Sequence, residues 1–492
     1  MDRRKGRIFK ITVFALLAVL AAAGIVYAVK VRRYSDASDN GTNGDAATVD
    51  LSALSPADES GDDEAGQASS DMDTENAEDQ YLTESGLKYS IGPYSDEGYT
   101  LEKVVVLSRH NIRSPLTGPR SSLYSLTPYS WCEWSSPPAE LSVKGGTLET
   151  EMGQYFRRWL EEEGVFEENY RPAEGEVRIY SNSWQRTIAT ARFFSTGLLP
   201  VSNTGVEHHK GLNNVDPVFY PRFTYFSAAY REAALSEMEG LYYLAMPDLS
   251  CDYRLLTDVL DMEESDAWQE GSFTGFCMDV PTFNLAKGRE PTVNGSLKTA
   301  CQLSDALILQ NYEEPERFGE ISGRELSTEE WEAIGGIKDI YGDVLFTSPL
   351  VAVNIAHPLL MEMDSELKNE QRKFSFICGH DSNLASVLAA LDAENYRLPE
   401  AFEKRTPIGS KFVVSCWRGE DGGEYISLDL VYQKVEQMQN VEILDEDNPP
   451  GIYGIRLNGL EMDENGLYRA SDVMGRFEEK IGEYDIIMEE YK

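Results

Sequence analysis

Three short motifs combine histidine, arginine and aspartate at spacings that could do chemistry together. The first, S-R-H-N-I-R-S-P over residues 108–115, places His110 between Arg109 and Arg113. An arginine guanidinium is a planar fork that can pair with two oxygens of a phosphate group. A histidine between two such forks could attack a phosphorus atom that they hold. This motif therefore indicates a nucleophilic histidine within an anion-binding site.

The other two motifs could complete such a site. The stretch C-G-H-D-S-N-L over 378–384 places His380 beside Asp381, and an aspartic acid can donate a proton to a leaving oxygen. The stretch S-N-S-W-Q-R-T over 181–187 adds a third guanidinium, that of Arg186. Each motif is weak evidence alone. The chain has only five histidines, so the coincidence of the three motifs favours one shared site.

Buried strands are expected to position all three motifs. Residues 103–108 contain a β-branched apolar run of buried-strand length, and residues 176–180 and 373–378 are predicted as two further strands. A motif begins where each of these three strands ends. Ligands of open α/β sheets bind beyond the carboxyl ends of the strands. We therefore expect the three motifs to form loops at one edge of a sheet.

The pattern of the remaining residues predicts an α/β domain with an insertion. Helical stretches at 184–195 and 382–391 follow two of the strands, and 411–417 with 425–433 flank a Gly/Asp turn typical of a hairpin. Strands that alternate with helices indicate α/β organisation. Residues 205–350 contain more helical stretches and fewer strands. They predict a largely helical cap inserted into the α/β core.

Composition and charge exclude several classes of protein. The 492 residues are 41% hydrophobic and 26% charged, which is ordinary for a globular protein and excludes a wholly disordered chain. The net charge is −40, whereas a nucleic-acid-binding protein needs a positive surface to contact phosphates. Arginines gathered in such an acidic chain indicate a dedicated anion pocket.

The N-terminus predicts export. Residues 1–10 are basic, and 11–29 form an uncharged apolar run of about the 20 residues that a transmembrane helix needs. The basic residues are expected to stay in the cytoplasm. A signal peptide cleaved near Ala28 is the alternative, but Lys30 directly after the run favours an uncleaved anchor. With an uncleaved anchor, the remaining chain is expected outside the cytoplasm, in a periplasm or at the cell surface. With a cleaved signal peptide, it is expected to be secreted.

Residues 34–80 change composition abruptly. They contain 14 acidic residues and no lysine or arginine, with many Ser, Gly, Asn and Ala. Such a stretch cannot bury enough apolar surface to offset the entropy lost on ordering. It predicts a disordered acidic tether. These 14 residues do not account for the net charge of −40, so residues 81–492 must be strongly acidic themselves.

The six cysteines allow disulfides in an exported chain. Cys251 with Cys277 is the predicted bridge, whereas Cys378 lies in an apolar strand and is predicted to be a buried thiol. No spacing resembles a zinc site, because the chain has no C-x-x-C pair.

Two of the motifs resemble a known family. R-H-N-I-R-S-P resembles the R-H-G-x-R-x-P signature of the histidine acid phosphatases, and G-H-D-S-N-L resembles the distal H-D signature of that family. The resemblance is to the bacterial branch of glucose-1-phosphatases and phytases, in which Asn replaces the usual Gly, as Asn111 does here. The stretches W-C-E-W, V-K-G-G-T-L-E and L-V-Y-Q-K-V-E-Q are also similar to this branch. The resemblance covers about 100–480, so the anchor and tether fall outside it.

The resemblance implies a fold and a division into domains. The fold would be α/β, with a mixed α/β sheet core of the phosphoglycerate-mutase-like type and an inserted, mainly helical cap. Within a phosphatase domain at 81–492, the core would comprise about 100–120, 140–204 and 350–450, and the cap about 205–350.

The resemblance also implies roles for six residues. His110 would be the nucleophile and form a phosphohistidine, and Asp381 would protonate the departing alcohol oxygen. The phosphoryl oxygens would be held by Arg109, Arg113, Arg186 and His380. No metal and no other cofactor is implied, because arginines supply the charge that Mg²⁺ provides in other phosphoryl-transfer enzymes. An acid that must stay protonated would favour activity at low pH.

The residues themselves support part of this scheme. His110 must be neutral to attack phosphorus, and nearby guanidinium groups disfavour its charged form. We therefore expect its pKa to be lowered.

The implied activity is extracytoplasmic hydrolysis of phosphate monoesters. The branch favours a sugar phosphate such as glucose 1-phosphate, with inositol hexakisphosphate (phytate) as the second candidate. Two other classes remain open. A phosphotransferase similar to phosphoglycerate mutase shares the R-H start, but the adjacent His380-Asp381 pair argues against it. A surface protein that binds phosphate without turnover is the non-enzymatic alternative. The sequence predicts no nucleic-acid partner and no particular oligomeric state.

Overall fold

The computed structural model describes residues 87–88, 91, 98–116, 122–131, 133–278, 281–319 and 323–492. The three N-terminal segments predicted above, 1–10, 11–29 and 34–80, lie outside the described residues. None of the described helices is by itself long and apolar enough to cross a membrane. The pair Thr328–Phe346 and Pro349–Lys368, bent by 85°, meets that test together by length and composition only.

The strands and α-helices of the described residues have the following bounds. The strands are β1 (Leu87–Lys88), β2 (Tyr99–Arg109), β3 (Val177–Ser181), β4 (Thr282–Asn284), β5 (Thr292–Asn294), β6 (Phe374–Gly379), β7 (Lys411–Gly419), β8 (Glu424–Tyr432), β9 (Gly451–Gly454) and β10 (Tyr468–Arg469). The helices are α3 (Val143–Glu162), α4 (Gln185–Leu198), α5 (Ala228–Val259), α6 (Asp266–Gln269), α7 (Ser296–Glu313), α9 (Thr328–Phe346), α10 (Pro349–Lys368), α11 (Asp381–Ala390), α12 (Val435–Asn440) and α13 (Ala470–Glu490).

A mixed sheet forms the centre of this part of the chain. Its strands lie in the order β1-β9-β8-β7-β2-β6-β3, with β10 beside β8. Strands β2, β6 and β3 run parallel, whereas β7 pairs antiparallel with both β2 and β8. The predicted α/β class with a mixed sheet is confirmed, and so is the predicted hairpin, which is β7 with β8.

The three parallel strands end at one edge of the sheet. Arg109 at the end of β2 is in register with Gly379 of β6, and Ser181 of β3 is in register with Cys378. All six residues of β6 are buried. A strand covered on both faces can be apolar at every position, which explains the continuous apolar runs in the sequence. The runs therefore predicted these strands to within a few residues at each end.

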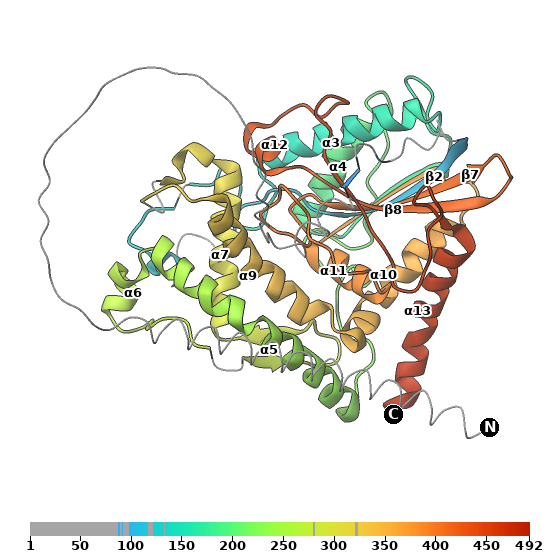
Figure 1. The fold of residues 1–492 in the computed structure, drawn as a ribbon. Coiled ribbons are helices and arrows are strands. Elements are labelled where there is room, and N and C mark those ends of the chain that lie inside the picture. The colour runs from blue at the N-terminus through green and yellow to red at the C-terminus, as the bar shows by residue number, and fades with distance from the viewer. Residues whose placement is uncertain are drawn as a thin grey trace, which may run out of the picture. The chain divides into compact units, whose positions relative to one another are not determined.

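Helices cover both faces of the sheet. Val104 and Val106 of β2 belong to the core cluster that includes α3 and α4 residues, whereas Val105 and Leu107 belong to the one that includes α10 and α11. This alternation follows from the two-residue period of a strand. Figure 1 shows α3 and α4 above the sheet and α10 and α11 below it.

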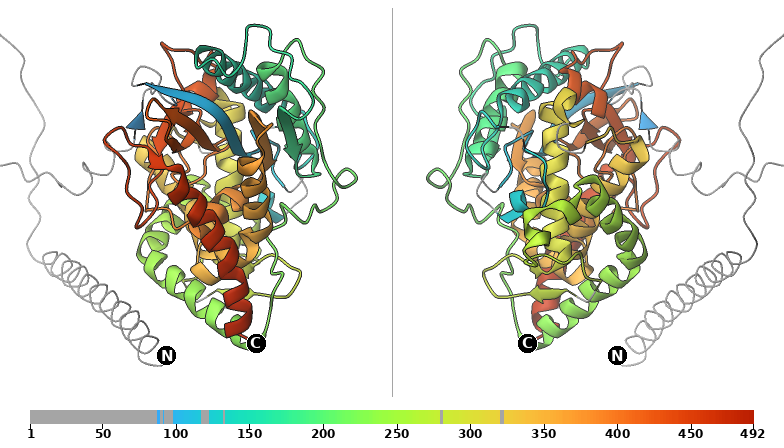
Figure 2. Two further views of the ribbon diagram at one scale, coloured as in Figure 1. Left: turned by 90° about the vertical axis from the view of Figure 1, so that its right-hand side faces the viewer. Right: turned by 90° about the vertical axis from the view of Figure 1, so that its left-hand side faces the viewer.

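The chain between α4 and β6 is mainly helical. It forms α5, α6, α7, α9 and α10, and its only described strands are β4 and β5, which pair with each other. Helices α5 and α7 both pack against α9. Figure 2 shows α5, in green, at the opposite end of the domain from α3 and α4, in teal. The predicted helical insertion is therefore present. That residues 205–350 form a separate cap domain with these boundaries stays a prediction.

The states of the cysteines contradict the predicted disulfide and confirm the predicted buried thiol. Cys251 and Cys277 are exposed free thiols, so the predicted bridge between them is wrong. Cys251 lies on α5, and Cys277 lies in the loop that precedes β4. The even number of cysteines, and the nearness of these two in the sequence, gave no information about the distance between their sulfur atoms in the fold. Cys378 is a buried free thiol of β6, as predicted.

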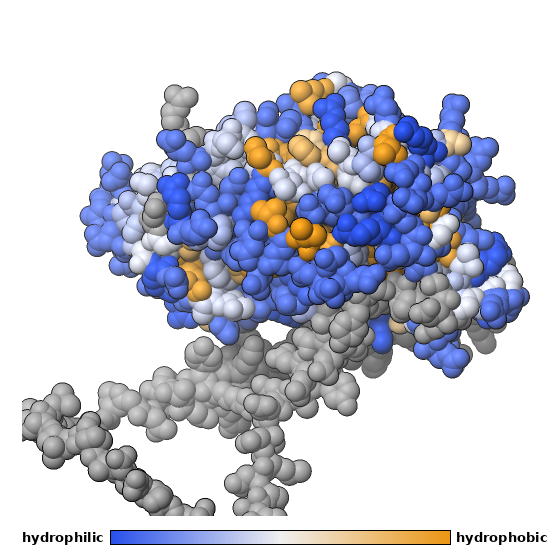
Figure 3. Space-filling model, turned by 90° about the horizontal axis from the view of Figure 1, so that it is seen from above, coloured by the Kyte–Doolittle hydropathy of each residue, from blue (hydrophilic) through white to orange (hydrophobic). Residues whose placement is uncertain are grey.

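The face of the molecule seen from above is mainly hydrophilic (Figure 3). Figure 3 views the molecule from above, and most side chains on that face are hydrophilic, with small separate apolar patches.

Candidate active site

The loops that carry the three motifs meet beyond the parallel strands. His110 follows β2, His380 follows β6, and the loop after β3 leads into α4, which carries Arg186 near its start. Backbone hydrogen bonds tie the loops together: the His110 N–H donates to the Gly379 carbonyl (3.1 Å), and the Asn182 N–H donates to the Cys378 carbonyl (2.9 Å). The strand order thus brings motifs that are far apart in sequence to one place.

These loops border a cavity of about 460 Å³, which lies within the usual size of small-molecule sites. Five of the six predicted site residues line it, namely His110, Arg113, Arg186, His380 and Asp381. The sixth, Arg109, is buried at 1% exposure, and its guanidinium lies 3.3 Å from Asp381. All six predicted residues are therefore together in the structure.

His110 is held as a neutral imidazole with one free nitrogen. Its Nδ1 lies 2.9 Å from the backbone oxygen of Asn111, which can only accept a hydrogen bond. Nδ1 must therefore carry the proton, which leaves the lone pair on Nε2. Burial lowers the pKa of His110 well below its usual value, and Arg186 and His380 lower it further. The direction agrees with the sequence-based expectation, although burial is a larger cause than the arginines.

His380 presents an N–H to the same space. Its Nε2 lies 2.8 Å from the side-chain nitrogen of Asn182. That nitrogen is a donor, because the side-chain oxygen of Asn182 already accepts from the Ser183 N–H (2.8 Å). Nε2 therefore accepts, and the proton lies on Nδ1, 3.5 Å from Arg186. Burial also lowers the pKa of His380 well below its usual value. Two donors that face each other in this way can share an anion oxygen.

A side chain of the distal motif sets the turn that carries His380. Asn383 accepts a hydrogen bond from the His380 N–H (2.9 Å) and donates to the Phe219 carbonyl (2.8 Å). A Cβ on Gly379 would lie 2.4 Å from the Asn383 side-chain oxygen. Glycine is therefore required at the end of β6, where the chain enters α11.

The three arginines have unused donors. The Nε atoms of Arg109, Arg113 and Arg186 are buried and have no hydrogen-bond partner in the described residues. Burial and the neighbouring Arg113 lower the pKa of Arg186 to about 10, so it stays charged at neutral pH. Buried donors without partners are costly. A bound anion would satisfy them and would relieve the repulsion between the guanidinium groups.

Asp381 is partly exposed, with 45% of its side chain accessible. Its Oδ1 accepts from the Ser382 N–H (2.8 Å) at the start of α11. Burial alone would raise its pKa, but Arg109 and Lys338 lower it to about 2. Without a ligand this pKa favours the ionised carboxylate, so a protonated Asp381 stays a prediction for the substrate-bound site. The physical reason is that the Arg109 and Lys338 charges attract the ionised carboxylate more strongly than burial disfavours it.

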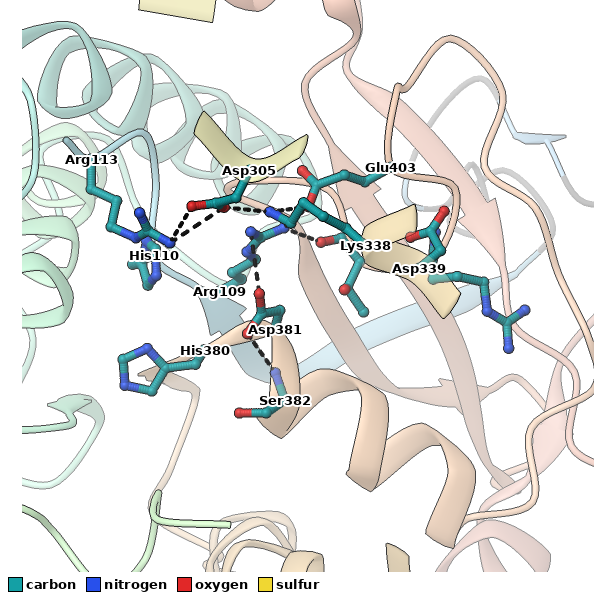
Figure 4. A network of polar contacts seen from close by, with 12 residues as sticks. Arg109, His110, Arg113, Asp305, Lys338, Asp339, His380, Asp381, Ser382 and Glu403 are labelled. Atoms are coloured by element: carbon teal, nitrogen blue, oxygen red, sulfur yellow. Dashed lines mark hydrogen bonds and ion pairs between the residues drawn. The ribbon is translucent and has the colours of Figure 1, made fainter. Parts of the chain in front are cut away.

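A charged network that sequence reasoning missed supports the arginines (Figure 4). Lys338 of α9 lies 2.7 Å from Asp305 of α7 and 2.8 Å from Glu403. Asp305 also pairs with Arg113 (3.1 Å), and Glu403 pairs with Arg109 (2.8 Å). The two carboxylates thus each join a site arginine to Lys338. Asp305 had one sequence signal, a charge within the otherwise uncharged helical stretch L-S-D-A-L-I-L.

Replacing Lys338 with methionine should destabilise the fold by about 3–5 kcal/mol at pH 7, because it leaves two buried carboxylates undercompensated. Burial alone would raise the pKa of Asp305, but Arg113 and Lys338 hold it below its usual value. A depressed pKa contributes stability above the unfolded-state value of about 4. That contribution is lost as the pH falls, so the deficit of the variant should shrink in acid. Urea unfolding of the variant and the wild type at several pH values measures this difference in the free energy of unfolding.

The matched control is Lys480→Met in α13, which removes one partly exposed pair with Glu483 (2.8 Å). It should cost no more than about 1 kcal/mol. Equal losses in the two variants would show that Lys338 does not support the site through its buried pairs.

Two further observations concern the described residues near the site. No cluster of three or more histidine, cysteine, aspartate or glutamate side chains in the described residues could hold a metal ion. Trp131 and Trp134, which follow the first motif, pack against the hydrophobic core and do not line the cavity.

Comparison with known proteins identifies similar chains. Residues 100–220 match the description Histidine phosphatase superfamily (branch 2). A glucose-1-phosphatase of Salmonella typhimurium is 37% identical over 75% of this chain and 90% of its own length. Phytase AppA of Escherichia coli is 27% identical over 75% of this chain and 88% of its own.

A solved structure has the same fold. The phytase from Citrobacter braakii superposes with a TM-score of 0.70 at 26% identity, over 79% of this chain and 98% of the phytase.

Proposed function

Because the chain belongs to the histidine phosphatase superfamily, branch 2, we propose that it hydrolyses phosphate monoesters through a phosphohistidine at His110. One observation carries the proposal. Three guanidinium groups, whose Nε atoms are buried and have no partner among the described residues, lie around a histidine whose Nε2 is free to attack. A tetrahedral phosphoryl group supplies the negative oxygens that those donors lack.

The first step transfers the phosphoryl group to the enzyme. His110 Nε2 forms a bond to phosphorus as the bond from phosphorus to the alcohol oxygen breaks. Arg109, Arg113, Arg186 and His380 donate hydrogen bonds to the phosphoryl oxygens as charge develops there. Asp381 gives its proton to the departing oxygen. It can hold that proton only with substrate bound, because the phosphate dianion offsets the arginine charges that keep its pKa low.

The second step releases inorganic phosphate. A water molecule attacks phosphorus, and its proton passes to the Asp381 carboxylate left by the first step. The bond from phosphorus to Nε2 breaks, and His110 returns to the neutral form with its proton on Nδ1. Asp381 is then protonated again, and it loses this proton when phosphate leaves, because its pKa is low in the unliganded site.

The charges of the cavity favour a substrate with one phosphoryl group, such as a sugar phosphate. Outside the arginine site the lining contains three further cations, Lys298, Lys338 and Arg405. Lys338 is neutralised by two carboxylates, and Arg405 pairs with Asp343 (3.5 Å). Only Lys298 forms no ion pair with a described residue. An ester with many phosphates would therefore meet several carboxylates and one available cation.

The full chain should release phosphate faster from glucose 1-phosphate than from inositol hexakisphosphate at about pH 5. The assay is run with a chelator, since the proposed mechanism uses no metal. Faster release from inositol hexakisphosphate would assign phytate as the preferred substrate instead. Phosphate binding without release from either ester would refute the enzymatic proposal and favour a phosphate-binding protein.

We also propose that this reaction takes place outside the cytoplasm. The support is the sequence, in which basic residues 1–10 precede the apolar run 11–29 and the acidic stretch 34–80. In this proposal the run anchors the chain in the membrane, the stretch is a tether, and 81–492 forms the phosphatase domain.

A further inference from the structure

A buried ion pair lies behind the nucleophile and has no part in the proposed reaction. Glu149 of α3 and Lys411 at the start of β7 are both 0% exposed, and their charged atoms lie 2.9 Å apart. Neither residue lines the cavity. Burying two charges costs several kcal/mol in desolvation, which their attraction repays only when further hydrogen bonds complete the site. The pair therefore requires an explanation beyond packing.

The further hydrogen bonds lead to the residue after His110. The side-chain nitrogen of Asn111 donates to Glu149 (2.9 Å), and Lys411 donates to the Gly409 carbonyl (2.8 Å). Burial raises the pKa of Glu149, and Lys411 and Asn111 oppose that rise. Lys411 thus favours the ionised carboxylate, which can only accept from Asn111.

Asn111 is held at four points. Besides its bond to Glu149, its side-chain oxygen accepts from the Ile112 N–H (2.8 Å), and its own N–H donates to Thr190 (3.1 Å). Its backbone oxygen accepts from His110 Nδ1 (2.9 Å). Gly409, whose φ is +75°, leaves space for this side chain. A Cβ added at Gly409 would lie only 2.7 Å from the Asn111 amide nitrogen.

We propose that Asn111, Glu149 and Lys411 form a positioning network that keeps the proton of His110 on Nδ1. The network fixes the peptide whose carbonyl accepts that proton, and Nε2 therefore keeps its lone pair towards the phosphorus atom. The inference rests on the proposed function for its catalytic consequence. It also gives a physical reason for asparagine in the R-H-N-I-R motif, since glycine has no side chain to reach Glu149.

Two double variants separate this role from simple packing. Glu149→Met with Lys411→Met removes both charges and the acceptor for Asn111. Glu149→Gln with Lys411→Met removes both charges but keeps an acceptor. Replacing a buried pair by uncharged residues of similar volume is commonly tolerated. Only the first variant should lower kcat, by about 10- to 100-fold with little change in KM. Asn111→Gly should have the same effect.

The decisive readout is the tautomer of His110 in the full chain, measured by ¹H–¹⁵N NMR with ¹⁵N-labelled histidine. Five histidines make the spectrum tractable, and His110→Ala identifies the signal. The wild type and the glutamine variant should show the proton on Nδ1 alone. The methionine variant and Asn111→Gly should show both tautomers.

An unchanged tautomer in Asn111→Gly and in the methionine variant would overturn the proposal, whether or not kcat falls. So would a changed tautomer with wild-type kcat. If one of these variants fails to fold, the other decides. If the wild type releases no phosphate from any ester, the proposed function fails, but the NMR comparison still tests the network.

Discussion

Replacing His110 with alanine should lower phosphate release by at least about 10⁴-fold, because no other group can form the bond to phosphorus. The variant should still bind inorganic phosphate, since its three arginines and His380 remain. Acid-quenched wild-type enzyme should carry a labile phosphoryl group after mixing with ³²P-labelled ester, and the variant should carry none. Steady-state release and the quench measurement together test the role of His110.

The matched control is His208→Ala, since His208 is exposed and its one hydrogen bond to a described residue is to the Lys210 carbonyl (2.9 Å). It should retain wild-type turnover. Equal loss in the two variants, or a labile phosphoryl group on His110→Ala, would refute the assignment of the nucleophile.

The same histidine determines one limb of the pH profile. Burial and nearby positive charge lower the pKa of His110, so the free enzyme keeps its nucleophile neutral as the pH falls below about 6.5. The acid limb of kcat/KM should therefore lie well below that value.

Replacing Asp381 with asparagine should lower kcat for an alkyl phosphate by about 10²- to 10⁴-fold, since the alkoxide would leave unprotonated. 4-Nitrophenyl phosphate has a much more acidic leaving group and needs little help from an acid. For this ester the first step should stay fast, while hydrolysis of the phosphohistidine slows because the base is lost. Rapid mixing should then show a burst of nitrophenolate equal to the enzyme concentration, followed by slow turnover.

Asp392→Asn is the isosteric control, at an exposed residue directly beyond the other end of α11. It should show neither the loss nor the burst. A loss of the same size for the alkyl and the aryl ester, without a burst, would show that Asp381 is not the general acid.

Much of the core could be predicted because its signals are local. The mainly apolar stretches at 103–108 and 373–378 correspond to β2 and β6, since a strand covered on both faces can carry apolar residues on both. A motif at the end of such a run lies at the ligand-binding edge of the sheet. That is why His110 and Asp381 could be predicted as site residues before any distance was known.

The supporting residues had no such local signal. Asp305 and Lys338 lie on α7 and α9, and their sequence spacing does not predict that they pair across two helices. Glu149 and Lys411 are 262 positions apart in the chain, and each looks like an ordinary charged residue. The wrong Cys251–Cys277 bridge has the same origin, because nearness in sequence does not set the distance between two thiols.

The sequence by itself determined the residue types of the candidate site, the strands that end beside them and the acidic character of the chain. The tertiary structure alone decided the protonation states. Whether Asp381 is ionised, and which nitrogen of His110 carries the proton, depend on charges and carbonyl groups within a few ångströms. Removal from water strengthens these electrostatic interactions, and only the fold determines which polar groups are buried next to one another.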